Sequence, residues 1–178
     1  MKATEVSTGE IRLSYANLFK PKAMTEGETE KYSTAILIPK TDKKTYNAII
    51  AAIEAAKQEG KGKWNGKIPP ALKLPLRDGD EEKPDDENYA GMWFLNASSV
   101  KKPQLVESVE GELVPITDPD ELYSGCYGRA ALNFYAFAGK QKGIAVGLNA
   151  IKKLRDGDAL GGGKVDVNEA FGDDSDEL

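Results

Sequence analysis

Residues 127–138 place aromatic, cationic and amide side chains at every second position. One set of alternate residues is small or apolar, as the inside of a barrel requires: Gly128, Ala130, Leu132, Phe134, Ala136 and Ala138. The other set is Tyr127, Arg129, Ala131, Asn133, Tyr135 and Phe137. Successive strand residues point to opposite faces, so the second set shares one face. Its rings suit base stacking and Arg129 suits a phosphate or a base. The alternative is that this face packs under a helix or a loop.

Lysines follow the ends of the neighbouring predicted strands. Lys101 and Lys102 come after residues 91–99, Lys140 and Lys142 lie in a predicted hairpin, and Lys31 begins a strand. Cations at strand ends can line a groove and track a phosphate backbone. Taken alone, a lysine at such a position is more often ordinary solvated charge than a phosphate contact. Trp93 is a further stacking candidate, although a strand tryptophan is more often part of the core.

A loop of glycines and lysines surrounds Trp64 in residues 60–67. Such a loop could clamp a nucleic-acid strand, or its tryptophan could fold back on the barrel. The loop does not match a phosphate-binding loop, because Ile68 stands where a hydroxyl residue must follow Lys67.

Several kinds of catalytic chemistry are excluded by composition. The chain has no histidine and a single cysteine, Cys126, so histidine-assisted nucleophiles, histidine metal sites and an intrachain disulfide are ruled out. Cys126 is expected to be buried and inert. Carboxylate chemistry stays open in the acidic run, for example at Asp78, Asp80 and Asp86 with Lys83. That run lacks the calcium-loop spacing, so no metal site and no cofactor are predicted.

Charge is distributed unevenly along the chain, whose net charge is −5. Residues 1–77 carry 14 basic and 8 acidic groups, whereas residues 78–87 carry 1 basic and 7 acidic groups. Residues 88–165 are nearly balanced, and residues 166–178 carry 6 acidic groups and no basic group. Without the last thirteen residues the chain is slightly basic, so the acidic pI does not argue against a nucleic-acid partner.

The elements that must position these residues are mostly strands. Alternation predicts strands over residues 9–19, 31–38, 91–99, 126–138 and 143–151, with a short strand over 104–109. In the first, Ile11, Leu13 and Tyr15 fall on one face. One helix is predicted over residues 41–59, capped by Thr41 and followed by Gly60. Residues 60–90 are a long connection, and residues 118–125 resemble a capped helical turn.

This pattern predicts a mainly β protein: an OB-fold-like antiparallel barrel with one main α-helix and long loops. Residues 1–156 form the expected barrel domain. Residues 157–178 form an expected flexible glycine-rich linker and acidic tail, which ends in Asp173, Asp174, Asp176, Glu177 and Leu178. The tail could aid solubility, cover a basic groove as a DNA mimic, or dock on partner proteins.

Five stretches together resemble a family of phage single-stranded DNA-binding proteins. They are residues 15–19, 32–39, 91–104, 125–137 and 142–151, and the resemblance covers roughly residues 9–155. The resemblance implies an OB-fold, sequence-independent binding of single-stranded DNA, and a role in phage replication, recombination or repair. It also implies that the acidic tail contacts replication or recombination proteins. Many such tails end in phenylalanine, whereas this one ends in Leu178 with Phe171 further back, so the anchoring residue stays open.

The resulting prediction is a non-enzymatic DNA-binding module in the bacterial host cytoplasm. No apolar run approaches the ~20 residues that a membrane helix needs, and no signal peptide is expected. A homodimer is left open. The competing hypotheses are a carboxylate- and metal-dependent nuclease and a phage structural or adaptor protein.

Overall fold

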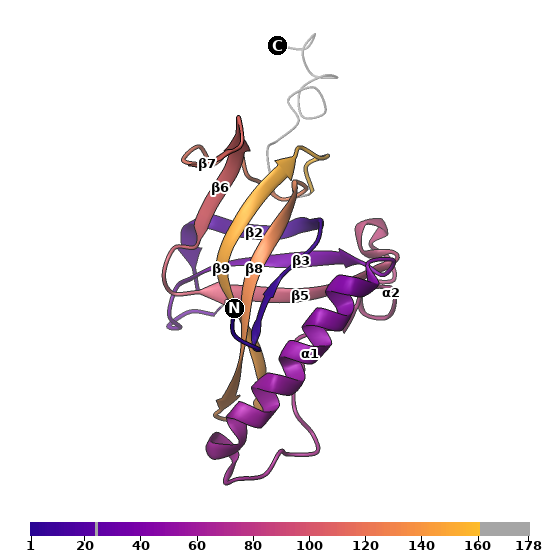
Figure 1. Cartoon of the computed structure of the whole chain (residues 1–178), viewed down its shortest axis with the longest axis vertical. Coiled ribbons are helices and arrows are strands. Elements are labelled where there is room, and N and C mark those ends of the chain that lie inside the picture. Colours follow the sequence, from indigo (N-terminus) through magenta and orange to yellow (C-terminus); the bar gives the residue numbers. More distant parts are fainter. Residues whose placement is uncertain (24, 161–178) are drawn as a thin grey trace, which may run out of the picture.

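Five strands close into a barrel in the computed structural model, which describes residues 1–23 and 25–160 (Figure 1). They are β2 (Ile11–Lys22), β3 (Lys31–Pro39), β5 (Met92–Ser99), β8 (Tyr127–Ala138) and β9 (Lys142–Arg155). Around the barrel, β2 pairs with β3, β3 with β5, β5 with β9, β9 with β8, and β8 with β2. The predicted mainly β barrel is confirmed, with one difference: β5 and β9 are parallel, joined at Ser98 and Gly147.

Alternate residues of these strands fill the barrel. Leu13, Ile36, Leu95, Leu132 and Leu148 are all fully buried, each contributed by a different strand. The alternation predicted for β8 is also observed, because all of its inward residues except the last, Ala138, are buried. Burying an aliphatic side chain of this size contributes about 1.5–3 kcal/mol, so the five strands hold one another in place.

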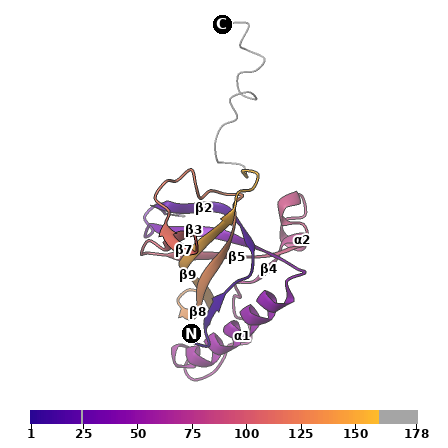
Figure 2. The same cartoon turned by 45° about the horizontal axis from the view of Figure 1, so that its top comes forward.

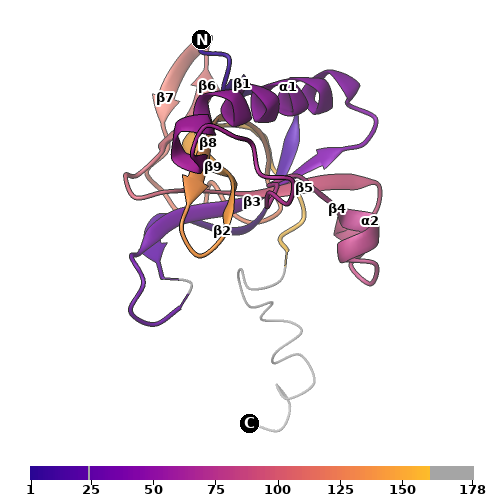
Figure 3. The ribbon, with the colours of Figure 1, turned by 90° about the horizontal axis from the view of Figure 1, so that it is seen from below.

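The main helix, α1 (Lys43–Glu59), covers one side of the barrel, where it packs on β8, on β1 (Glu5–Ser7) and on β9 (Figure 3). Its N-cap is Asp42 rather than the predicted Thr41. The Asp42 carboxylate accepts hydrogen bonds from the Thr45 amide at 3.0 Å and the Thr45 hydroxyl at 2.6 Å. Thr41 lies in the preceding turn, one residue too early to reach these donors.

Three short strands, β1, β7 (Glu112–Pro115) and β4 (Arg77–Asp78), were not predicted from the sequence. β1 pairs with β8, and β7 forms a hairpin with β6 (Gln104–Val109), whose range was predicted. The predicted capped turn over residues 118–125 is present, but it does not continue as a helix. The Asp118 carboxylate accepts the Asp120 amide at 2.9 Å, and the Asp118 carbonyl accepts the Glu121 amide at 3.0 Å.

The connection between α1 and β5 contains four short elements. They are η1 (Gly60–Trp64), β4 (Arg77–Asp78), α2 (Gly79–Glu82) and η2 (Glu87–Tyr89). Trp64 is buried, and its indole N–H donates to the Phe137 carbonyl at 3.1 Å. The tryptophan therefore folds back on the barrel, which was one of the two alternatives. α2 stands at the side of the barrel opposite β7 (Figure 2).

Tyr89 anchors the acidic segment, defined here as residues 78–87, to the outside of the barrel. Its ring is buried against Leu37 and meets Phe94 edge-on, with 5.1 Å between ring centroids. Its hydroxyl donates to the Ser14 hydroxyl at 3.2 Å. The segment, part of the predicted long connection, is thus fixed against the outer faces of β2, β3 and β5.

The chain beyond β9 stays against the barrel as far as it is described. An Arg12 Nη donates to the Asp158 carbonyl at 2.8 Å, and the Leu160 amide donates to the Ser124 carbonyl at 2.9 Å. The predicted tail residues lie outside the described residues, so the division at residue 156 stays a prediction. Within residues 1–23 and 25–160, no helix is long and apolar enough to cross a membrane.

Candidate nucleic-acid interface

Tyr135 and Phe137 lie on the outer face of β8, as their alternation predicts. Tyr135 is 39% exposed, and Phe137 is half-buried. In the β8–β9 pairing they stand opposite Ala145 and Gly143, whose small size leaves both rings prominent. A Cβ at Gly143 would come within 2.4 Å of the Lys73 carbonyl oxygen, so only glycine lets residue 73 lie against β9.

Small side chains continue this outer face across three strands. The β5–β9 pairing sets Ser98 opposite Gly147. The β3–β5 pairing sets Ser33 opposite Ser98 and Ala35 opposite Asn96. The floor is the name used here for the outward residues that are not buried: Ser33, Asn96, Ser98, Ala145 and Gly147. Since none of them is bulky, the floor is a shallow strip with aromatic side chains standing above it at the β8 side.

Two clefts meet on the floor at Ser98, which lines both of them. One, of about 220 Å³, includes Phe137, Lys73 and Arg77. The other, of about 560 Å³, is lined by Lys22, Gly27, Glu28, Thr29, Lys31, Ser33 and Ser98. Together they form one path, called the groove here. Its four cations, Lys22, Lys31, Lys73 and Arg77, give it a net positive lining.

The remaining predicted lysines lie near the ends of this groove. Lys140 and Lys142 are exposed at the β8–β9 turn, and the Lys142 carbonyl accepts the Lys73 amide at 3.0 Å. Lys101 and Lys102 are exposed just after β5, where the Lys102 ammonium lies 5.2 Å from the Phe19 ring centroid. The structure therefore groups eight of the predicted or newly found cations around one face.

Three predicted site residues lie elsewhere. Trp93 faces α1. Its ring stacks on the Tyr46 ring with 5.1 Å between centroids, and the Lys40 ammonium lies 4.8 Å from the Trp93 ring centroid. Arg129 is tied to the β1 side, because its Nε donates to the Thr8 carbonyl at 2.7 Å. Tyr127 lies at the far end of β8 beneath the Arg155 guanidinium, 3.9 Å from its ring centroid. Eight residues of strand separate it from Tyr135, a span of about 26 Å.

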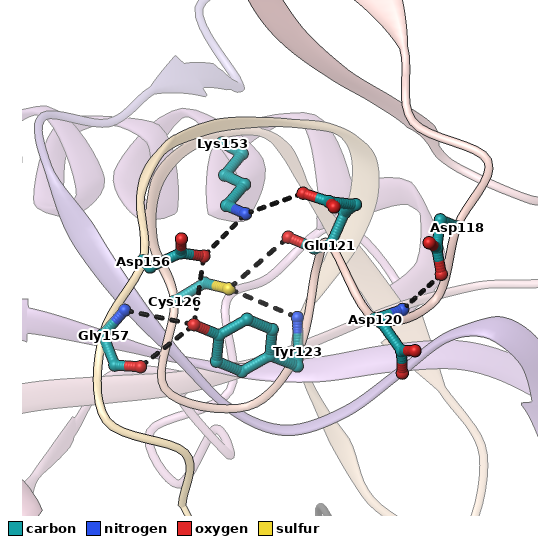
Figure 4. A network of polar contacts seen from close by, with 8 residues as sticks. All are labelled: Asp118, Asp120, Glu121, Tyr123, Cys126, Lys153, Asp156 and Gly157. Atoms are coloured by element: carbon teal, nitrogen blue, oxygen red, sulfur yellow. Dashed lines mark hydrogen bonds and ion pairs between the residues drawn. The ribbon is translucent and has the colours of Figure 1, made fainter.

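A polar network fills the end of the molecule near Tyr127 (Figure 4). The Lys153 ammonium lies 2.8 Å from Asp156 and 3.5 Å from Glu121, and the hydrogen bond from Lys153 holds the pKa of Asp156 below its ordinary value. The Gly157 amide donates to the Tyr123 hydroxyl at 3.3 Å. Burial raises the pKa of the Cys126 thiol, as expected of an inert cysteine. The network fastens residues 121–126 to the end of β9.

Tyr15 is an exposed aromatic residue that the alternation placed on the wrong face. Ile11 and Leu13 are buried as predicted, but the pairing with β3 shifts register between Ser14 and Asn17. Tyr15 adopts φ = 48° in this bulge and is 63% exposed. Its neighbour Asn17 pairs with Ser33 of the floor. Tyr15 thus stands at the β2 border of the floor, across from Tyr135.

Arg77, Lys73, Asn96 and Ser98 also belong to the groove but were not singled out from the sequence. Serine and asparagine in a strand carry no distinctive signal. Lys73 and Arg77 alternate with Leu72, Leu74 and Leu76, but this stretch is short and interrupted by proline, so it was not assigned to a strand. Only the pairing of β4 with β5 brings Arg77 to this face.

The acidic segment uses its carboxylates within the protein. The Lys40 ammonium lies 2.6 Å from Asp78 and 2.8 Å from Asp80, and its hydrogen bonds lower the pKa of both carboxyls. Asp86 caps η2 by accepting the Asn88 amide at 3.0 Å. In the part of the chain that the structure describes, no three histidine, cysteine or carboxylate side chains are grouped to hold a metal ion.

The barrel order and its outer groove define an OB-fold protein. Such folds bind oligonucleotides on the face of their second and third strands, here β3 and β5, and through the loops that follow the first and fourth strands. The first of these loops contributes Gly27, Glu28 and Thr29 to the lining of the groove, and the second is residues 139–141.

Comparison with known proteins identifies the family. The family model described as Enterobacter phage Enc34, ssDNA-binding protein, matches residues 4–178. Protein p50 of Acyrthosiphon pisum secondary endosymbiont phage 1 is 31% identical over 179 residues, covering 95% of this chain and 93% of that protein. The chain belongs to the phage single-stranded DNA-binding protein family of Enc34.

Solved structures agree with this assignment. The single-stranded DNA-binding protein of bacteriophage Enc34, solved in complex with ssDNA, is 28% identical, with a TM-score of 0.77 over 90% of this chain and 91% of that chain. The ssDNA-binding protein gp2.5 of bacteriophage T7 shares the fold at 13% identity, with a TM-score of 0.60 over 96% of this chain and 93% of that chain. The family consists of non-enzymatic binding proteins, which confirms the prediction that the chain is not an enzyme.

Proposed function

We propose that this chain binds single-stranded DNA without sequence preference along the groove. The observation that carries the proposal is the floor of small residues on the outer face of β3, β5 and β9, lined by cations. Four of these cations, Lys22, Lys31, Lys73 and Arg77, face the groove. Bases stack on Tyr135, Phe137 and Tyr15, and the cations contact phosphates. None of these contacts distinguishes one base from another.

The test is a titration of fluorescently labelled oligo(dT) with the protein and with Lys31→Gln. Lys31 lies in the groove, whereas Lys43 is exposed at the start of α1, so Lys43→Gln is the matched control. We expect Lys31→Gln to weaken binding severalfold and Lys43→Gln to leave it nearly unchanged. Equal effects would show that the groove is not the binding surface, and the absence of binding by the wild type would refute the function itself.

In the cell, we propose that the protein protects single-stranded DNA during phage replication, recombination or repair in the host cytoplasm. The acidic tail, including Asp173, Asp174, Asp176 and Glu177, contacts partner proteins and competes with DNA. Its concentrated negative charge supports this role. Replacing these four carboxylates with amides is expected to tighten oligo(dT) binding and to abolish capture of a replication partner. Unchanged DNA affinity would refute competition by the tail.

A homodimer is the proposed assembly, and the β6–β7 hairpin supports it. Leu113 is 62% exposed and Val114 is 39% exposed on β7, whose outer edge pairs with no other strand among the described residues. Exposed edges of this kind readily pair with a second chain. Sedimentation of wild type and Leu113→Lys tests this, with a dimer expected only for the wild type. A monomeric wild type would refute it.

A further inference from the structure

Arg77 lies where the groove meets the acidic segment. β4 runs antiparallel to β5 with Arg77 opposite Phe94, so Arg77 shares the outer face with Asn96, two residues further along β5. Its side chain lines the 220 Å³ cleft together with Asn96, Ser98 and Phe137. The charged residues of that cleft are Arg77 and Lys73, and both are cations.

Glu82 reaches Arg77 from the acidic segment. Its carboxylate oxygen Oε1 lies 3.3 Å from Arg77 Nε, and the two side chains are 40% and 43% exposed. Such exposed pairs are weak, because water competes for both partners. The contact is an ion pair at Nε, so the Nη donors of the guanidinium are open to a second acceptor.

The other carboxylates near Glu82 have different partners or none on the groove side. Asp78 and Asp80 bind Lys40, and Asp86 caps η2. The remaining acids of the segment, Glu81, Asp85 and Glu87, are exposed. Glu82 is therefore the acid of this segment that pairs with a groove cation.

A phosphate presents the same kind of acceptor to a guanidinium as a carboxylate does, and both are bound through parallel N–H donors. We propose that Arg77 is a phosphate-binding residue that Glu82 occupies while the groove is empty, so that an incoming DNA phosphate displaces the carboxylate. This inference rests on the proposed function. It makes α2 a built-in competitor that lowers the affinity of the groove for single-stranded DNA.

The test is a double-mutant cycle on oligo(dT) affinity at several salt concentrations, with Arg77→Gln, Glu82→Gln and the double variant. Asp85→Asn removes the same charge from the same segment without touching Arg77, so it measures the general electrostatic effect. We expect the oligo(dT) affinity of the Glu82→Gln variant to be about three times that of the Asp85→Asn variant. Arg77→Gln should weaken binding and reduce the slope of log K against log salt by about 0.7, the value for one phosphate on a single strand.

In the double variant, the gain specific to Glu82→Gln should disappear, because no guanidinium remains to be released. The inference is overturned if Glu82→Gln gains no more than Asp85→Asn, or if the gain persists without Arg77. Thermal melting of each variant checks that it is folded. If the wild type binds no oligo(dT), the proposed function is refuted together with this inference. If the wild type binds, but the effects of Arg77→Gln and Glu82→Gln on the binding free energy simply add in the double variant, this inference alone is refuted.

Discussion

At the scale of single residues, Tyr15 combines a strained backbone with an exposed ring. A left-handed conformation costs a non-glycine residue about 1–2 kcal/mol, and φ is 48° at Tyr15. Burial does not repay this cost, because the ring is 63% exposed. Strain at an exposed residue is typical of binding sites. The Lys83 ammonium, 5.6 Å from the ring centroid, also keeps the ring beside the acidic segment.

Tyr15→Gly separates the two properties, because glycine adopts positive φ without strain. We expect the free energy of unfolding to stay equal or to rise by about 1 kcal/mol. We expect oligo(dT) binding to become weaker by about 1–3 kcal/mol, because one stacking ring is lost. Urea unfolding and fluorescence titration measure the two quantities. Undiminished binding would remove Tyr15 from the DNA site.

Tyr135→Ala tests the opposite border of the floor. Loss of its ring should weaken oligo(dT) binding by about 1–3 kcal/mol. Tyr46→Ala is a suitable comparison, because Tyr46 belongs to α1 and its ring stacks on Trp93, away from the groove. Titration of both variants should show a loss of affinity for Tyr135→Ala alone. An equal loss in both would indicate a general effect on folding.

The limits of sequence reasoning appear at particular residues. Period-two alternation located Tyr135 and Phe137 on the outer face of β8, because that strand is regular there. It failed at Tyr15, because a bulge reverses the face of one residue without changing the sequence pattern. It grouped Tyr127 and Arg129 with Tyr135, because alternation specifies a face but not a position along it. Trp93 was ambiguous, since α1 covers one face of β5 and Tyr89 the other.

At the scale of elements, the capping of α1 can be tested through pH. Hydrogen bonds from the Thr45 hydroxyl and amide lower the pKa of the Asp42 carboxyl. A lowered pKa in the folded state gives stabilisation that is complete above the unfolded-state pKa of about 4 and is lost as the pH falls through the folded-state pKa. Asp42→Ala should therefore cost about 1 kcal/mol at pH 7 and less near pH 3.

The control is Thr41→Ala, which should change stability little, because Thr41 is not the cap. Urea unfolding at pH 7 and pH 3 provides the comparison. A larger effect of Thr41→Ala than of Asp42→Ala would mean that the helix begins at the residue predicted from sequence rather than at Asp42.

At the scale of the whole molecule, the groove predicts how affinity depends on salt. Four groove cations, each neutralising one phosphate of a single strand, give a slope of log K against log salt of about −3. Titrations between low and high salt measure the slope. A slope near zero would mean that stacking alone holds the strand, and a much steeper one would extend the contacts to Lys101, Lys102, Lys140 and Lys142.

The parallel pairing of β5 with β9, which closes the barrel, has a consequence for folding kinetics. Ser98 and Gly147 are distant in sequence, so this pairing has high contact order and its closure is slow relative to the local β8–β9 hairpin. Both residues belong to the floor, so a chain in which this pairing has not formed has no continuous groove. During refolding, we expect oligo(dT) binding to recover with the slowest phase of barrel formation, and not with an earlier phase of strand formation seen by circular dichroism. The newly synthesised chain would then remain unable to capture DNA until its barrel is complete.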